Sequence, residues 1–532
     1  MLTGGEAVVR GLLAHGVDTL FGLPGIQNDW LYNALFDAGD AIRVVHSRHE
    51  QGAAYMALGY AQAGGGVGVC SVVPGPGFLN ASAALATAYG LNAKVLLLVG
   101  QIPSTSIGRG LGILHEIPDQ LSMLRSLTKW AERVVDPSEA ATRVAEAFWQ
   151  LHSGRPRPVG LEIPMDVLER RTAVVSGPPV LPHRAPPVDG GAVEEAAKLL
   201  GQAEAPMIFV GGGAQGVGVE VTELAEALQA PVVGYRTGRG VVDSRHYLSL
   251  YQPPARRYWQ RSDVVLAVGT TMRVPLQRWV RDQRPRLVRI DVDPASHQLL
   301  TLPDIAITAR AEEALPVLLG ALERYNRTRP SREEELLELR AWWAREVAGL
   351  EPQLSFLKVI REELGEDGIF VDELTQVGYA SRIAFPVYRP KTFISTGYLG
   401  TLGYGFPTAI GVKLARPEVP VVSVAGDGGF LFGVQELATA VQQGVPVVTI
   451  LFNDNRYGNV QMMQKGLYEN RVIATDLHNP DFVELAAAFG ALGIRAEAPA
   501  DLRQALRRGL SADGPTLIEV PVGEMPSIDR FR

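Results

Sequence analysis

The sequence has a single cysteine, Cys70, among its 532 residues. One thiol forms no intramolecular disulfide, and Cys70 lies in the apolar run "VGVCSVV", where we expect a small core residue rather than a nucleophile. No uncharged apolar run reaches the ~18 residues that a membrane-spanning helix needs. The sequence therefore predicts neither a disulfide-stabilised secreted domain nor a membrane protein.

A block of basic residues is also missing, and the formal net charge is −7. Both features argue against a nucleic-acid-binding surface. The N-terminus, "MLTGGEAVVRGLLAHGV", has an early acidic residue and no long apolar region, so we expect no secretory signal. With 46% hydrophobic and 20% charged residues, the composition is that of a globular protein. We expect a cytoplasmic enzyme.

Short apolar runs alternate with helical patterns along the whole sequence. Examples are "AIRVVHS", "KVLLLVG", "DVVLAVG", "RLVRIDV", "PVVSVAG" and "PVVTILFN", most of them almost continuous in Val, Ile and Leu. This pattern is typical of parallel strands that are buried on both faces and joined by helices. A chain of this length is expected to divide into several domains.

Two stretches interrupt this alternation. Residues 176–191 are rich in Pro and Gly, and residues 324–340 are charged and lead into a helix. They divide the chain into segments of roughly 1–175, 190–325 and 345–532, each long enough for a domain. We therefore predict an α/β protein with three doubly wound parallel-sheet domains.

Two polar clusters end consecutive predicted strands in the third segment. "PVVSVAG" leads into GDGG (426–429), and "PVVTILFN" leads into NDN (453–455). Since one helix joins the two strands, both clusters should lie on the same edge of a parallel sheet. Carboxylate and amide oxygens suit Mg²⁺, and glycine leaves backbone N–H groups open to an anion. The spacing predicts a site for a metal-bound diphosphate.

These motifs resemble those of a known superfamily. GDG, followed after 24 residues by ND, resembles the thiamin diphosphate signature, and "RHEQGAA" around Glu50 resembles the segment that carries its activating glutamate. "VPGPGFLNA" (73–81) and "GYLGTLGYGFPTAIG" (397–411) match in the same order along the chain. The resemblance covers essentially the whole chain and is greatest for the acetolactate synthase, pyruvate oxidase and benzaldehyde lyase group. It implies pyrimidine-binding, central and diphosphate-binding domains.

Glu50 has two interpretations. An acid in the first turn of a helix is favoured by the unpaired N–H groups and by the helix dipole alone. The resemblance implies a chemical role, in which the glutamate hydrogen-bonds N1′ of the aminopyrimidine and so promotes loss of the proton from C2 of the thiazolium. A carboxyl group in a dry pocket can share a proton with a ring nitrogen in this way.

The resemblance also implies the residues that bind the cofactor. Asp427, Asp454 and the carbonyl group of Arg456 would hold Mg²⁺, with Asn453 replacing Asp454 if the alignment shifts by one residue. The remaining cofactor contacts would come from Gly75, Asn80, Thr375, Leu402, Gly426, Gly428, Gly429, Tyr457 and Gly458. In this superfamily the glutamate and the diphosphate site belong to different subunits, which implies a homodimer or a homotetramer.

The substrate side of the site has three further candidates. His115, in "GILHEIPDQ", stands where acetolactate synthases and pyruvate oxidases carry Gln, and it is a candidate proton donor and acceptor. Gln27 and Asn28 follow a Pro-Gly turn and are further catalytic candidates.

The resemblance implies a lyase or ligase that acts on a small 2-oxo acid or 2-hydroxyketone. Acetolactate synthase-like carboligation is the first expectation. A benzaldehyde lyase-like enzyme or a simple decarboxylase comes next, followed by an oxidase and a non-catalytic relative.

The central segment bears on the oxidase alternative. "FVGGGAQGVG" (209–218) follows a predicted strand and could cradle a phosphate, which leaves FAD as an option. Flavin-binding relatives continue with a Gly-Met-His-Gly-like stretch and an Arg-rich segment, where this sequence reads "SLYQPPARR" and "GTTMRVPLQRW". We therefore expect thiamin diphosphate and Mg²⁺ without a flavin.

Overall fold

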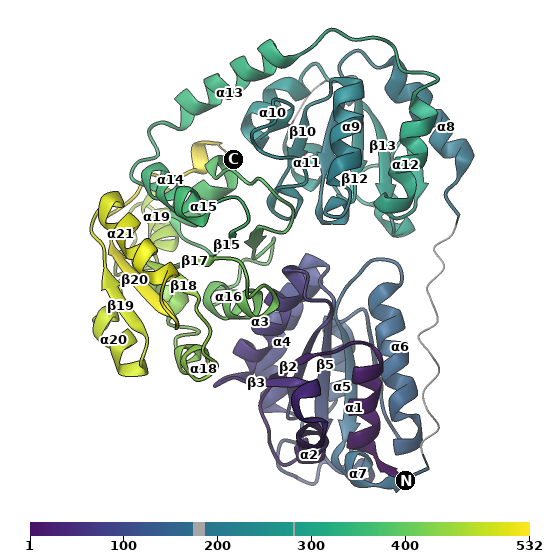
Figure 1. Ribbon diagram of the computed structural model, residues 1–532, viewed down its shortest axis with the longest axis vertical. Coiled ribbons are helices and arrows are strands. Elements are labelled where there is room, and N and C mark those ends of the chain that lie inside the picture. Colours follow the sequence, from purple (N-terminus) through teal and green to yellow (C-terminus); the bar gives the residue numbers. More distant parts are fainter. Residues whose placement is uncertain (174–186, 280–281, 532) are drawn as a thin grey trace. The chain divides into compact units, whose positions relative to one another are not determined.

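The computed structural model describes residues 1–173, 187–279 and 282–531, and the predicted linker at 176–191 lies largely outside them. Three parallel six-stranded sheets carry flanking helices (Figure 1), as the sequence predicts. The chain divides into two compact units. One unit takes in the described residues up to 173 together with 396–522, and the other takes in 187–395 together with 523–531. The three domain boundaries drawn from the sequence stay a prediction.

The first sheet lies in the N-terminal segment, with strand order β3-β2-β4-β5-β7-β6 and parallel pairing throughout. Its strands are β2 (Thr19–Gly22), β3 (Arg43–His46), β4 (Gly68–Val72), β5 (Val95–Gln101), β6 (Trp130–Arg133) and β7 (Val159–Pro164). Its helices are α1 (Gly4–Ala14), α2 (Asp29–Ala38), α3 (Glu50–Gln62), α4 (Pro76–Leu91), α5 (Gln120–Leu127), α6 (Ala140–His152) and α7 (Met165–Glu169). β1 (Leu2–Thr3) pairs antiparallel with β8 (Arg171–Thr172) beside it.

The strand order of this sheet reverses between β2 and β4, because β3 adds to one side of β2 and the later strands add to the other. Ligands of such sheets gather at the carboxyl ends of the strands beside the reversal. The loop after β2 carries Gln27 and Asn28, and the loop after β4 carries Gly75. Three predicted site residues therefore flank the expected ligand crevice.

The third sheet has the strand order β16-β15-β17-β18-β20-β19. Its strands are β15 (Ile369–Asp372), β16 (Phe393–Ser395), β17 (Val421–Gly426), β18 (Val448–Asn453), β19 (Leu492–Arg495) and β20 (Thr516–Pro521). Its helices are α14 (Gln353–Leu364), α15 (Gln376–Ala384), α16 (Gly405–Ala415), α17 (Asp427–Phe430), α18 (Glu436–Gln442), α19 (Gly458–Leu467), α20 (Phe482–Phe489) and α21 (Pro499–Leu510). β17 and β18 pair in parallel, so GDGG and NDN lie at the same edge, as predicted.

The helix after GDGG differs from the sequence expectation. The sequence suggests one helix over "GVQELATAVQQG" (433–444), whereas α18 covers only Glu436–Gln442 and α17 forms a separate turn at Asp427–Phe430. Gly428 and Gly429 lie within α17, and residues 431–435, which include Gly433, form the turn that separates α17 from α18. Glycine is a poor helix former, and Gly433 favours this turn.

Helices α3 and α16 pack closely within the first unit (Figure 1). A Cβ atom on Gly59 would lie 2.1 Å from the Thr408 carbonyl oxygen, and one on Gly411 would lie 1.9 Å from the Met56 carbonyl oxygen. Only glycine permits this approach of two backbones. The packing brings the start of α3, with Glu50, into the neighbourhood of the segment from 396 to 442.

The second unit contains the central sheet, with strand order β11-β10-β9-β12-β13-β14. Its strands are β9 (Met207–Val210), β10 (Val232–Gly234), β11 (Ser249–Leu250), β12 (Val264–Val268), β13 (Arg286–Asp291) and β14 (Ile305–Thr308). Its helices are α8 (Gly190–Gln202), α9 (Gly218–Leu228), α10 (Gln252–Trp259), α11 (Arg273–Arg278) and α12 (Ala311–Leu322), and α13 (Glu333–Val347) follows them. Among the described residues, no helix has the length and apolar character needed to cross a bilayer.

Candidate active site

Glu50 is the first residue of α3, directly after the turn that follows β3. One carboxylate oxygen, Oε2, accepts a hydrogen bond of 3.0 Å from Nδ2 of Asn80 on α4. A Cβ atom on Gly77 would lie 3.4 Å from the other oxygen, Oε1. The structure thus brings together two predicted site residues, and Asn80 fixes the orientation of the Glu50 carboxylate.

Gln27 connects the turn after β2 to the loop that carries His115. Its Nε2 donates to the Leu114 carbonyl oxygen at 2.9 Å, and its Oε1 lies 3.0 Å from Nδ1 of His115. Because an amide oxygen only accepts, Nδ1 of the neutral His115 carries the proton and Nε2 carries the lone pair. His115 also has φ +70, a backbone conformation that is uncommon outside glycine and gathers at functional sites. The two predicted catalytic residues therefore form one unit.

Asn28 has a different environment. Its Oδ1 accepts from the Gly25 amide at 2.7 Å, and its Nδ2 donates to the Leu23 carbonyl oxygen at 3.1 Å and lies 3.4 Å from Oγ of Ser71. The side chain is 1% exposed. These contacts hold the turn in shape, and a direct catalytic role for Asn28 stays a prediction.

Gly75 is held in position by the hydrogen bonds of a buried polar network. Its amide donates to Oε1 of Gln120 at 2.8 Å, and Nε2 of Gln120 donates to Glu162 at 3.0 Å. Glu162 also accepts from Gln101 at 2.8 Å and from Arg133. Gly75 has φ +57, and a Cβ there would lie 2.4 Å from the His115 carbonyl oxygen. The glycine loop and the His115 loop are thus in contact.

The second cluster lies at the carboxyl ends of β17 and β18. Burial raises the pKa of Asp427, which is 2% exposed. Burial and then the nearby charge of Asp427 raise the pKa of Asp454 to about 6. The carboxylates of Asp427 and Asp454 are shielded from water at the same sheet edge, so their negative charges repel each other. A bound cation would reduce that repulsion.

Asn479 joins this cluster from the loop before α20. Its Nδ2 lies 2.6 Å from Oδ2 of Asp427 and 3.1 Å from the side-chain oxygens of both Asn453 and Asn455. Among the described residues, its buried Oδ1 has no hydrogen-bond partner. Oδ1 of Asn479 is an acceptor beside two carboxylates, and a cation or an ordered water molecule would supply its partner.

Asn453 has its own partners. Its Nδ2 donates to Oε1 of Glu519 at 2.9 Å, and its Oδ1 accepts from the Asn455 amide at 3.2 Å. The electrostatic neighbour of Asp427 is therefore Asp454. Asp454 as the second ligand, with Asn453 as its alternative, stays a prediction.

The donor set fits Mg²⁺. In the part of the chain that the structure describes, no three His, Cys, Asp or Glu side chains gather as a metal site. A cation between Asp427 and Asp454 would therefore need carbonyl, amide or water oxygens as well, which is how Mg²⁺ is usually bound. That the Arg456 carbonyl is one of them stays a prediction. The Arg456 guanidinium itself donates to the Asp454 carbonyl oxygen at 2.9 Å.

The glycines of this edge are required by close neighbours. A Cβ on Gly428 would lie 2.5 Å from the Tyr457 ring, and one on Gly458 would lie 2.6 Å from Oδ2 of Asp454. Gly426 ends β17 and Gly429 lies in α17. The backbone at this edge is therefore tightly constrained where diphosphate contacts are predicted.

Two further residues predicted to contact the cofactor, Leu402 and Thr375, lie outside the clusters described above. Leu402 lies in the turn before α16, in the first unit. Thr375 belongs to the second unit, where it caps α15 by accepting from the Gly378 amide at 2.9 Å. The cofactor contacts of both residues stay predictions.

The glycine-rich turn of the central sheet is filled by protein. A Cβ on Gly211 would lie 2.3 Å from the Gly269 carbonyl oxygen, and one on Gly213 would lie 2.8 Å from the Gly269 Cα. These loops follow β9 and β12, between which the strand order reverses. The glycines thus allow two loops to pack at the place where a nucleotide would be expected.

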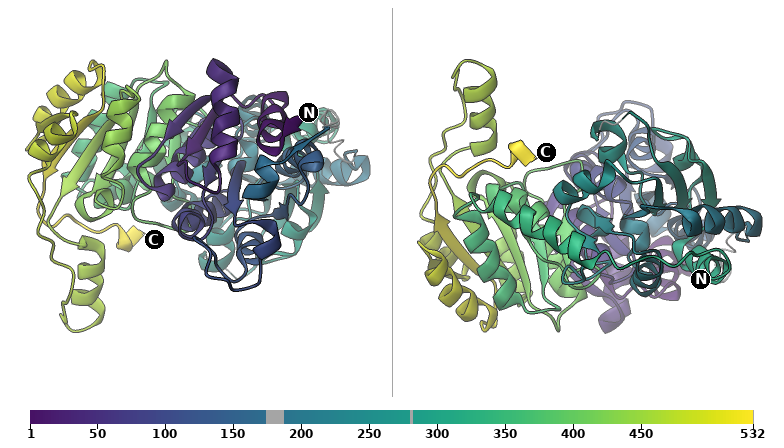
Figure 2. Two further views of the ribbon diagram at one scale, coloured as in Figure 1. Left: turned by 90° about the horizontal axis from the view of Figure 1, so that it is seen from below. Right: turned by 90° about the horizontal axis from the view of Figure 1, so that it is seen from above.

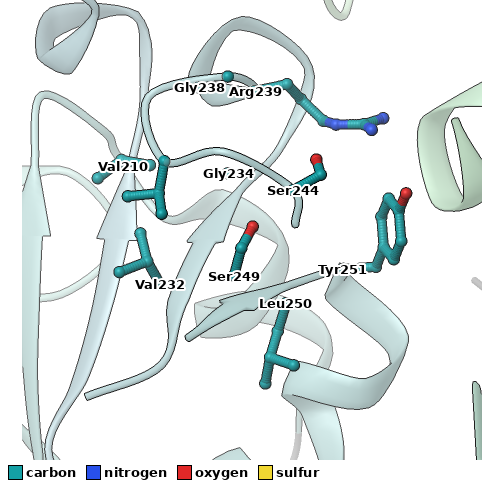
Figure 3. A pocket seen from close by; sticks show the side chains of 11 residues that line it. Val210, Val232, Gly234, Gly238, Arg239, Ser244, Ser249, Leu250 and Tyr251 are labelled. Carbon is teal, nitrogen blue, oxygen red and sulfur yellow. The ribbon is translucent and has the colours of Figure 1, made fainter. Parts of the chain in front are cut away.

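A small cavity lies nearby, at the ends of β9, β10 and β11 (Figure 3). It encloses about 20 Å³, room for one water molecule. Arg239 lines it, but its guanidinium donates to the carbonyl oxygens of Ser381 and Phe385. This cavity does not accommodate a flavin, although the absence of FAD from the protein stays a prediction.

Three models of known protein domains match the chain. The N-terminal TPP-binding domain of thiamine pyrophosphate enzymes matches residues 2–123, the central domain matches 193–318, and the C-terminal TPP-binding domain matches 375–520. This chain belongs to the thiamine pyrophosphate enzyme family. The family assignment drawn from the GDG and Glu50 motifs is confirmed.

Several curated relatives span nearly the whole chain. A probable 2-ketoarginine decarboxylase, AruI, of Pseudomonas aeruginosa is 36% identical over 98% of this chain and 94% of its own length. A probable acetolactate synthase large subunit of Methanocaldococcus jannaschii is 32% identical over 98% and 92%. Acetolactate synthase isozyme 3 large subunit of Escherichia coli is 32% identical over 96% and 92%.

Several residues that support the predicted site residues through hydrogen bonds were not identified from the sequence. Gln120 and Glu162 support Gly75, and Asn479 contacts Asp427. Glu162 could have been noticed as a lone carboxylate in the apolar run "PVGLEIP", because such a group is almost never buried without a partner. Asn479 precedes a proline, which by itself indicates only a turn.

Proposed function

We propose that this thiamine pyrophosphate enzyme depends on Mg²⁺ and cleaves the bond between the carboxylate and the carbonyl carbon of a small 2-oxo acid. It would then join the remaining fragment to a second carbonyl compound, as the name acetolactate synthase describes for two of the relatives. The observation that carries the metal and cofactor part of the proposal is the placement of Asp427 and Asp454 at the carboxyl ends of the neighbouring strands β17 and β18.

The residues of the chain have separable tasks in this proposal. Thiamin diphosphate, when bound, supplies a nucleophilic carbon and an electron sink. Asp427 and Asp454 would hold the cation that binds its diphosphate. Glu50, oriented by Asn80, would hold a proton at the pyrimidine nitrogen.

His115 is proposed to move protons on the substrate side. The hydrogen bond to Gln27 sets its tautomer, so Nε2 is the nitrogen that accepts a proton from substrate and returns it. The positive φ of His115 and the contact of its backbone with Gly75 fix where the ring stands.

A simple decarboxylase is the second candidate. The relative at 36% identity is named a probable 2-ketoarginine decarboxylase, whereas the acetolactate synthase relatives given above are at 32%. In this case the fragment would be protonated instead of joined to a second carbonyl. The substrate would be a 2-oxo acid with a longer, cationic side chain.

Product analysis distinguishes the two candidates. The purified protein would be incubated with thiamin diphosphate, Mg²⁺ and either pyruvate or 5-guanidino-2-oxopentanoate, and products would be followed by proton NMR without added flavin. Acetolactate or acetoin from pyruvate supports carboligation. An aldehyde from the guanidino acid alone supports the decarboxylase. Turnover of either compound by Asp427→Ala at the wild-type rate would contradict the placement of the metal site.

We also propose a homodimer or homotetramer. Helix α19 stands out from the third sheet (Figure 2) and exposes apolar side chains. Together with the loop that follows it, these side chains are Val460, Met463, Leu467, Tyr468 and Ile473. An apolar surface of this kind is typical of a protein–protein contact, and sedimentation of the holoenzyme would test for it.

A further inference from the structure

Glu436, the first residue of α18, is a buried carboxylate with an unusual set of partners. Its oxygens accept from the Arg48 amide at 3.2 and 3.1 Å and from the His49 amide at 3.0 Å. Oε2 also accepts from the Thr439 hydroxyl at 2.7 Å. The residue is 0% exposed. Thus a side chain from the third sheet binds the two backbone N–H groups immediately before Glu50.

The fit between Glu436 and α3 is close. A Cβ atom on Gly52 would lie 2.4 Å from Oε1 of Glu436 and 2.6 Å from its Cδ. Gly52 therefore provides the space in which the carboxylate reaches the start of α3. The Arg48 side chain turns elsewhere and donates to Gln442 at 3.1 Å, so the contact at Glu436 is with the backbone of residues 48 and 49.

We propose that Glu436 is a positioning residue for Glu50: by binding the Arg48 and His49 amides it fixes the first turn of α3 and hence the direction of the Glu50 carboxylate. The inference rests on the proposed role of Glu50 and goes beyond it. Hydrogen bonds to an ionised acceptor are stronger and shorter than neutral ones, so they hold backbone well. Proton transfer depends steeply on such alignment.

The same contact joins the first turn of α3 to the segment that follows β17 within one chain. The Asp427 turn and Glu436 belong to one continuous segment, 427–436, which follows β17. The segment that carries the predicted metal ligand thus also holds the helix that carries Glu50. Burial raises the pKa of Glu436, while the bonds from Thr439 and from the two amides oppose that rise.

The test compares three variants with the wild type. Glu436→Gln keeps the shape and removes the charge. Gln442→Ala is the matched control, because it removes a contact between the same two segments without touching the two amides. Glu50→Gln tests the proposed function itself. The measurements are amide hydrogen exchange in the protein without cofactor, the dissociation constant of thiamin diphosphate with Mg²⁺, and C2–H exchange of bound cofactor.

For Glu436→Gln we expect amide exchange at Arg48 and His49 to be about 10-fold faster and C2–H exchange about 10-fold slower, as loss of a charged hydrogen bond implies. The dissociation constant should stay within about threefold, and Gln442→Ala should change nothing beyond that range. A purely structural role would instead weaken cofactor binding and C2–H exchange to the same extent, and this result would overturn the proposal.

The outcomes separate the inference from the function on which it rests. If Glu50→Gln slows C2–H exchange and Glu436→Gln does not, the positioning role is wrong and the proposed function stands. If Glu50→Gln leaves exchange unchanged, the proposed function fails. If Glu436→Gln does not fold, Glu436→Asp takes its place, because it keeps the charge and shortens the side chain. The same results that support or overturn the proposal for Glu436→Gln then apply to Glu436→Asp.

Discussion

Replacing Gly52 by alanine should destabilise the protein, although helix propensity alone predicts the opposite. Gly52 lies within α3, where alanine is favoured over glycine by about 1 kcal/mol. The added methyl carbon would lie 2.4 Å from Oε1 of Glu436, against at least 3.4 Å for ordinary contact. Since Glu436 is fully buried, its carboxyl group would have to move by roughly 1 Å, enough to break bonds of 3.0–3.2 Å.

The magnitude follows from three opposing contributions. The gain in helix propensity is about 1 kcal/mol. Overpacking of a filled interior costs about 1–3 kcal/mol, and weakening one charged hydrogen bond costs about 1.5 kcal/mol or more. The net effect is a destabilisation of about 2 kcal/mol, which corresponds to a fall of about 4–8 °C in Tm for a unit of ordinary domain size.

Thermal unfolding of paired variants tests this reasoning. Gly320→Ala is the matched control, because Gly320 lies in α12 with no atom within 4 Å of the added carbon, and it should raise Tm slightly. In a Glu436→Ala background, Gly52→Ala should no longer destabilise, giving a coupling of about 2 kcal/mol or more. A Tm for Gly52→Ala equal to or above that of the wild type would refute the packing argument.

Three further substitutions probe the site. Asn479→Leu removes the donor to Asp427, and Mg²⁺-dependent retention of thiamin diphosphate on dialysis should weaken about 10-fold. Asp454→Asn replaces a charged predicted ligand by a neutral one, so a Mg²⁺ titration should show several-fold weaker binding with the site retained; unchanged affinity would argue against Asp454 as a ligand. Gln120→Leu removes the acceptor of the Gly75 amide, and the free energy of unfolding should fall by about 1–3 kcal/mol.

The fold was accessible from local sequence patterns. The run "PVVTILFN" became β18, which is buried along its whole length, because continuous Val and Ile are favourable only where both faces of a strand are covered. The run "AIRVVHS" became β3, an edge strand of which only Val45 is buried. The start of α18 was not accessible, because residues 433–435 form a turn although they continue the helical sequence pattern. The approach of α3 to α16 through Gly59 and Gly411 depends on tertiary packing that no local window contains.

In the candidate site, too, some residues could be predicted from local sequence patterns and others could not. Glu50 and Asp427 could be found because each lies in a short motif with recognisable spacing. Glu436 could not, because the amide of His49 that it binds is 387 residues away in the sequence. Asn479 is 52 residues from Asp427 and lies in a plain Asn-Pro turn. Residues that contact a ligand leave local signals, whereas residues that orient them are selected by distant partners.

The segment from β17 to β18 therefore does more than carry a metal motif. Asp427 begins it and Asp454 follows it, and Glu436 between them holds the first turn of α3. A shift of this segment would move both the predicted cation ligand Asp427 and the first turn of α3, because Glu436 joins them within one chain. Functional groups held on packed helices and strands keep their geometry better than groups on loops. The buried carboxylate of Glu436 joins the segment after β17 to the first turn of α3, the helix that carries Glu50.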